Sequence, residues 1–90
     1  MTSVNPLSID LHGLRPDAAL ARLEQGLHTA RAQGWRQVRV ITGRGMSNRT
    51  QTPVLREKVE AWLRGAAGKR SGVQGFQRAD KGGSLLVQLS

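Results

Sequence analysis

The fold is decided by residues 7–43, which read LSIDLHGLRPDAALARLEQGLHTARAQGWRQVRVITG. Apolar residues alternate with polar ones over residues 7–12, and this period of two predicts a strand with one apolar face. A proline start, a leucine stripe at spacings of three and four, and a glycine stop predict a helix over residues 16–33. A second strand is predicted over residues 36–43. Together these elements predict a right-handed βαβ unit with parallel strands.

The remaining sequence completes a small α/β domain. A second helix is predicted up to Gly65, with Thr52 as its cap and Pro53 in its first turn. Two strands around the turn DKGG predict a closing hairpin. Residues of the second helix expected to face water are Arg56, Glu57, Glu60 and Arg64. The predicted fold is a two-layer βαβαββ sandwich with a mixed four-stranded sheet, formed by residues 7–90 after an N-terminal tail of residues 1–6.

Length and composition exclude several classes of protein. Ninety residues make one domain, and the absence of cysteine excludes disulfides and thiolate metal sites. The N-terminal residues show no secretory leader, and no run approaches the roughly 20 apolar residues of a membrane helix. We therefore expect a soluble, cytoplasmic protein, monomeric as far as the sequence indicates, with no membrane association.

The charge of the chain favours a polyanionic partner. Fourteen Lys and Arg stand against six Asp and Glu, for a formal net charge of +8, and eleven of the fourteen are arginine. Arginine is suited to bidentate contacts with phosphate. Nucleic acid, bound through its backbone, is the natural partner, although a generally basic composition is the alternative.

Reactive residues follow both strands of the predicted βαβ unit. Asp10 and His12 end the first strand and point the same way, because side chains two apart share a face. A TGRG loop ends the second strand and consists of Thr42, Gly43, Arg44 and Gly45. Because ligands bind outside the carboxyl ends of strands in open α/β sheets, these two segments are expected to meet at one site.

The residue types at this edge suit phosphate chemistry. Glycines let backbone N–H groups approach a phosphate, while Arg44 and Arg49 could grip its oxygens. An imidazole titrates near neutral pH, so His12 could act as general acid or base, with Asp10 orienting it or binding a metal. The alternatives are a solvated strand end for Asp10 and an ordinary turn for His12. Asp10 is the one acid predicted at these strand ends, so Mg²⁺ or Mn²⁺ has a single candidate ligand, and no organic cofactor is expected.

The motifs IDLHG, RPDAAL and VITGRG, with a PVLREKVEAWL helix and a GG hairpin, resemble the Smr (small MutS-related) domain. The resemblance covers about residues 7–89. It implies a βαβαββ sandwich similar to the C-terminal domain of a bacterial translation initiation factor, and nucleic-acid binding with DNA-nicking or RNA-cleaving endonuclease activity. Its two motifs fall on residues 9–12 and 42–45, and both are implied to serve the nucleic-acid site.

Three functions follow from these observations. The first is an endonuclease in which Asp10 and His12 are catalytic and the TGRG loop with Arg49 binds phosphate. The second is a binding module of the same fold that acts on nucleic acid or ribosomes without turnover. The third is an enzyme acting on a small phosphorylated molecule. A lone histidine without a carboxylate cluster favours RNA, where the 2′-hydroxyl supplies the nucleophile, and leaves DNA open.

Overall fold

The structure is a computed structural model that describes residues 7–43, 51–79 and 83–90. Its elements, in chain order, are β1 (Leu7–Asp10), α1 (Pro16–Ala32), β2 (Gln37–Ile41), α2 (Gln51–Arg64), α3 (Ala66–Arg70), β3 (Val73–Ala79) and β4 (Ser84–Leu89). The predicted tail of residues 1–6 and the hairpin turn at residues 80–82 lie outside the described residues.

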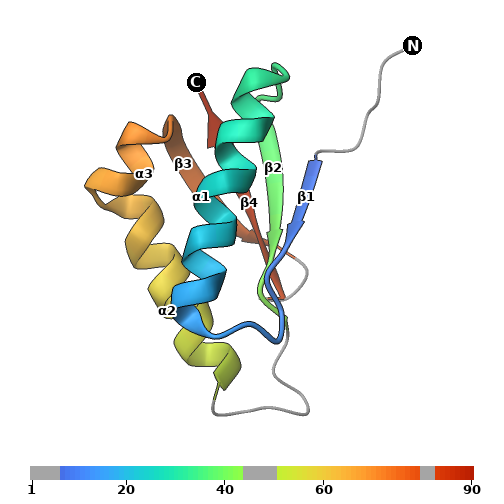
Figure 1. Cartoon of the computed structure of the whole chain (residues 1–90), viewed down its shortest axis with the longest axis vertical. Helices are drawn as coiled ribbons and strands as arrows, with labels where there is room; N and C mark the ends of the chain where they lie inside the picture. The colour runs from blue at the N-terminus through green and yellow to red at the C-terminus, as the bar shows by residue number, and fades with distance from the viewer. Residues whose placement is uncertain (1–6, 44–50, 80–82) are drawn as a thin grey trace.

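The four strands form one sheet in the order β1-β2-β4-β3 (Figure 1). β1 and β2 are parallel, while β4 runs antiparallel to both β2 and β3. The predicted mixed sheet, βαβ unit and closing hairpin are therefore confirmed. In this order β1 and β3 are the edge strands. The register pairs Asp10 with Ile41, so the first two strands end side by side.

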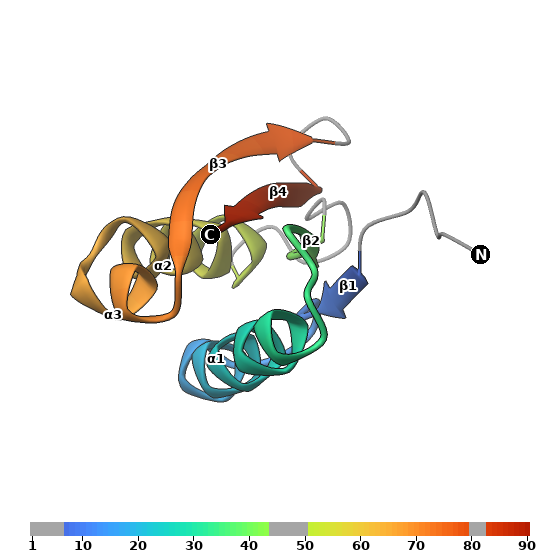
Figure 2. The same ribbon diagram turned by 90° about the horizontal axis from the view of Figure 1, so that it is seen from above.

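Both long helices cover the same face of the sheet (Figure 2). The buried core comes from the apolar faces of the strands and the stripes of the two helices, and it consists of Ile9, Leu11, Ala19, Leu23, Leu27, Ala30, Val38, Val40, Leu55, Val59, Leu63, Leu85, Val87 and Leu89. The period-two and helical patterns of the sequence account for this set, because each element buries one face. The result is the predicted two-layer sandwich.

The closest approach of α1 to the sheet is at Gly26. A Cβ atom on Gly26 would lie 2.5 Å from Cδ1 of Ile9, a buried residue of β1. Glycine costs about 1 kcal/mol relative to alanine inside a helix. This close contact with β1 is the structural reason for a glycine there, and it sets how near α1 lies to the edge strand.

Three sequence-based boundaries need correction. β1 ends at Asp10, so His12 belongs to the turn that follows the strand. α2 begins at Gln51, which places Thr52 within the helix and not at its cap. The segment interpreted as a linker contains the short helix α3, whose Gly68 is buried. Its alanines and lysine are good helix formers, and packing against α2 stabilises a helix too short to persist alone.

The prediction that Glu60 faces water is wrong. Only 7% of its side chain is exposed, and Arg78 of β3 binds both carboxylate oxygens, with Nε to Oε2 at 2.9 Å and Nη2 to Oε1 at 3.3 Å. This contact, opposed by burial, lowers the pKa of Glu60 below its usual 4.5. The Arg78 side chain is 60% exposed, so the pair links α2 to the edge of the sheet at the surface of the domain.

Replacing Arg78 with glutamine is expected to lower the free energy of unfolding at neutral pH by about 1–2 kcal/mol, because a buried carboxylate loses its charged donor. The contribution of the pair is fully present above the unfolded-state pKa of Glu60 and is lost as pH falls through the lower folded-state value. Urea midpoints at neutral and acid pH should therefore differ between the two proteins at neutral pH and converge in acid. A difference that persists in acid would contradict this assignment.

Candidate functional site

Asp10 and His12 form an exposed pair directly after β1. His12 Nδ1 lies 2.6 Å from Asp10 Oδ1, and the same oxygen accepts the His12 backbone N–H at 3.1 Å. The side chains are 66% exposed for His12 and 50% exposed for Asp10. The prediction that the two residues point the same way is confirmed, and the pair is open to a ligand from solvent.

The turn after β1 holds His12 in this position. Leu14 donates its backbone N–H to the carbonyl of Leu11 at 3.2 Å, which closes a four-residue turn with His12 and Gly13 at its centre. Gly13 has a φ of +79°, in the left-handed region that glycine adopts without strain. Leu11 is fully buried and anchors the start of the turn. The sequence LHGL thus presents an imidazole on a turn attached to the core.

The electrostatics of the pair favour an ionised carboxylate and one histidine tautomer. The hydrogen bond from His12 lowers the pKa of Asp10, against a small opposing effect of burial. A carboxylate at Nδ1 favours the proton on that nitrogen. Proton transfer to a ligand then falls to Nε2, the second ring nitrogen of His12.

The end of β2 lies beside this pair, as the two parallel strands require. Leu11 donates its N–H to the carbonyl of Ile41 at 2.7 Å. The N–H groups of Thr42 and Gly43 both go to the carbonyl of Gly83, at 3.1 and 3.0 Å. The Gly43 N–H is therefore committed to the hairpin, contrary to the expectation that it reaches a phosphate. Gly43, with a φ of +93°, turns the chain out of the strand.

The remaining predicted phosphate-binding residues, Arg44, Gly45 and Arg49, lie outside the described residues. The first two residues of the TGRG loop are thus attached to the sheet edge next to Asp10 and His12. The loop's predicted arginine contacts stay a prediction.

The Thr42 side chain lies beneath the surface. It is 1% exposed, and within the described parts of the chain its hydroxyl oxygen has no hydrogen-bond partner. In this structure the hydroxyl is not presented to a phosphate, so the expected substrate contact through this side chain is not formed. The residue instead fills space where β2 ends.

A Thr42→Val variant is expected to keep or raise the free energy of unfolding, by up to about 1 kcal/mol, because it removes a buried hydroxyl that gains no hydrogen bond. Thermal unfolding of both proteins measures this effect. Oligonucleotide affinity should stay within about twofold, the spread expected for a change away from the binding surface. A marked loss of affinity at unchanged stability would show that the hydroxyl does reach the ligand.

Arg22 joins the site from α1, a residue that sequence reasoning missed. Its Nε donates to the backbone carbonyl of Asp10 at 3.1 Å. The signal was present in the sequence: α1 starts at Pro16, a short loop after β1. Six residues advance a helix by only about 9 Å, so Arg22 must lie close to the end of that strand.

Within residues 7–43, 51–79 and 83–90, no three His, Cys, Asp or Glu side chains gather as a metal site. A divalent cation at this edge would have the Asp10 carboxylate as its candidate ligand. The same part of the chain has no helix long and apolar enough to cross a membrane.

Comparison with known proteins identifies the family. The profile of the Smr domain matches residues 9–90. The chain belongs to the Smr domain family. The crystal structure of the Smr domain of Thermus thermophilus MutS2 is similar, with a TM-score of 0.75 and 30% identity over 93% of this chain and 98% of that one.

Two solution structures agree with this assignment. The SMR domain of NEDD4-binding protein 2 has a TM-score of 0.70 and 29% identity over 100% of this Smr domain and 92% of that chain. The B3BP Smr domain has a TM-score of 0.62 and 28% identity over 92% of this chain and 77% of that one. No curated protein sequence gives a significant match. Smr domains are known for nucleic-acid binding and nuclease activity.

Proposed function

We propose that this Smr domain is an endonuclease that cleaves a phosphodiester bond with the Asp10–His12 pair. The observation that carries the proposal is the 2.6 Å contact between an exposed imidazole and an exposed carboxylate at the carboxyl end of β1. Exposed acid–histidine pairs at such edges are suited to proton transfer on a bound ligand.

In this mechanism Asp10 holds the imidazole through Nδ1, and Nε2 takes a proton from the nucleophile. The nucleophile is the 2′-hydroxyl of RNA or a water molecule for DNA. Its oxygen attacks phosphorus, the bond from phosphorus to the 5′-oxygen breaks, and that oxygen leaves with a proton from solvent or from the protonated histidine. RNA is the favoured substrate, because a single histidine then needs to activate only an internal nucleophile.

Positive charge supports binding of the substrate. The chain carries a formal charge of +8, and Arg22 lies at the catalytic pair itself. We assign phosphate contacts in the TGRG segment to Arg44 and Gly45, and flanking backbone contacts to Arg49. Thr42 and Gly43 serve the substrate site by attaching this segment to Gly83.

The first experiment is cleavage of supercoiled plasmid and of a structured RNA by the purified protein, with Mg²⁺ or Mn²⁺ and with EDTA. The proposal expects RNA cleavage or plasmid nicking that follows the protein through purification. Activity in EDTA would show that no divalent cation is needed. Tight, salt-sensitive binding of both nucleic acids without cleavage would favour the binding module, and binding that declines little with salt would count against both.

A further inference from the structure

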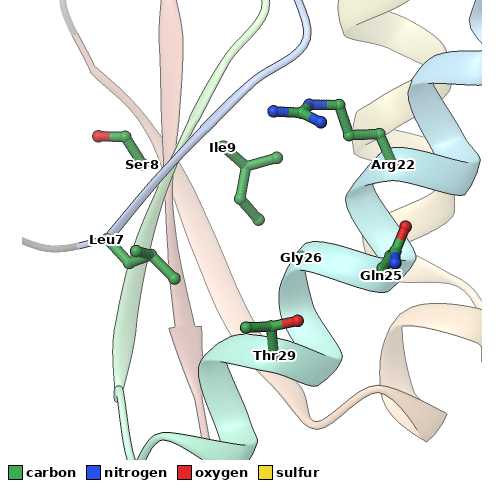
Figure 3. Close-up of a pocket in the computed structure, with 7 residues that line it drawn as sticks. All are labelled: Leu7, Ser8, Ile9, Arg22, Gln25, Gly26 and Thr29. Carbon is green, nitrogen blue, oxygen red and sulfur yellow. The ribbon is translucent and has the colours of Figure 1, made fainter.

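A groove of about 300 Å³ runs between β1 and α1 along the outer edge of the sheet. Its lining residues are Leu7, Ser8, Ile9, Arg22, Gln25, Gly26 and Thr29 (Figure 3). This volume is at the lower end of the range for sites that take small ligands. The groove begins next to Asp10 and His12, since Arg22 contacts both regions.

The main chain of Ser8 offers a hydrogen-bond donor and an acceptor to this groove. In β1, Leu11 directs its N–H to β2, whereas the carbonyl of Asp10 points to Arg22 on α1. Alternate residues of a parallel strand direct their main-chain groups to the same side. Ser8, two residues before Asp10, therefore presents its N–H and C=O to α1, while its side chain points away from the helix (Figure 3).

Arg22 supplies a cation at the end of the groove nearest the catalytic pair. Its side chain extends from α1 towards β1 (Figure 3). The bond to the Asp10 carbonyl uses Nε, one of five N–H donors of the planar group. The terminal nitrogens are the atoms that bind phosphate in a bidentate manner.

We propose that this groove holds the nucleotide that flanks the cleaved phosphodiester, with its phosphate on Arg22 and its base edge on the Ser8 main chain. Gln25 and Thr29, exposed on α1, add polar contacts, and Leu7 adds an apolar one. The inference rests on the proposed function and adds a subsite to it. The lining contains no aromatic residue, so the base is held by its edge and not by stacking.

A nucleotide fits this groove better than an extended peptide. An added strand would need main-chain groups along the whole edge of β1, but the carbonyl of Asp10 is already bonded to Arg22. Ser8 alone keeps a complete pair facing the groove within the four residues of β1. One donor–acceptor pair is sufficient for a base edge, and the arginine at its end complements a phosphate.

The test is an NMR titration of the ¹⁵N-labelled full chain with a short single-stranded RNA carrying 2′-O-methyl riboses. That RNA lacks the 2′-hydroxyl nucleophile. We expect the amides of Ser8 and Thr29 and the side-chain amide of Gln25 to shift together with those of Asp10 and His12.

Two variants quantify the subsite. Arg22→Gln is expected to weaken RNA binding about 5- to 20-fold, the effect of one charge-assisted contact. Arg70→Gln removes the same charge from α3, on the far side of the domain, and should change the Kd by less than about twofold (Figure 1). Thr29→Leu fills the groove without touching Asp10 or His12, and it should also weaken binding.

The outcomes separate the subsite from the proposed function. Shifts at Asp10 and His12 with none at Ser8, Gln25 or Thr29 would overturn the groove and leave the endonuclease intact. An absence of shifts at both places, with uncut RNA and plasmid, would overturn both. Equal shifts of the groove amides with a poly-glutamate peptide would show that the groove takes an acidic peptide, which also overturns the subsite.

Discussion

Replacing His12 with alanine is expected to lower the single-turnover rate of RNA or plasmid cleavage by about 10²–10⁴-fold, the usual contribution of a general acid–base group. His12 is 66% exposed, so its loss removes little packing. The free energy of unfolding should fall by less than about 0.5 kcal/mol, as for other surface changes. Affinity for uncleaved oligonucleotide, measured by fluorescence anisotropy, should stay within about threefold because phosphate contacts dominate binding.

The matched control is Arg70→Gln, purified in the same way. This variant should cleave at the wild-type rate, which excludes a nuclease contaminant as the source of a difference. Wild-type cleavage by the His12→Ala protein would remove His12 from the chemistry. A loss of affinity equal to the loss of rate would instead show that His12 binds the substrate without catalysing its cleavage.

Replacing Gly68 with alanine is expected to cost about 3 kcal/mol or more in the free energy of unfolding, the upper range for overpacking a core. A Cβ atom there would lie 2.2 Å from the Leu63 carbonyl oxygen and 2.8 Å from its Cα. These are backbone atoms of α2, so the contact cannot be relieved by a side-chain rotation. Thermal unfolding should show a decrease in Tm of more than about 10 °C for a domain of this size.

Gly75→Ala is the control for this effect. A Cβ atom at Gly75 would meet the nearest atom, Oε1 of Gln88, at 3.7 Å, an ordinary van der Waals contact. Its free energy of unfolding should change by about 1 kcal/mol or less. A Gly68→Ala protein as stable as this control would mean that α3 does not pack on α2 as described.

Local patterns carried the sequence predictions that the structure confirms. The alternation in residues 7–12 placed Asp10 and His12 on one side, because side-chain direction in a strand depends only on position. The parallel pairing of β1 with β2 followed from the right-handed crossover and brought Asp10 beside Ile41. The functional motif and the fold signal are therefore the same residues.

Features that depend on tertiary contacts could not be predicted in this way. Glu60 occupies a polar position in the sequence of α2 but is buried because β3 brings Arg78 onto it. Thr42 resembles a loop residue and yet is covered at the end of β2. Arg22 joins the site only because α1 lies along the edge strand. Each case needs the distance between two elements, which periodicity alone does not contain.

The central claim is that Asp10 and His12 act as one catalytic unit, and a double-mutant cycle tests it most directly. Single-turnover cleavage rates would be measured for the wild type, Asp10→Asn, His12→Ala and the double variant. If Asp10 acts through His12, the double variant should be no slower than His12→Ala, since members of one unit are strongly non-additive. Rates that multiply, with the double variant slower by the product of both single effects, would contradict the claim.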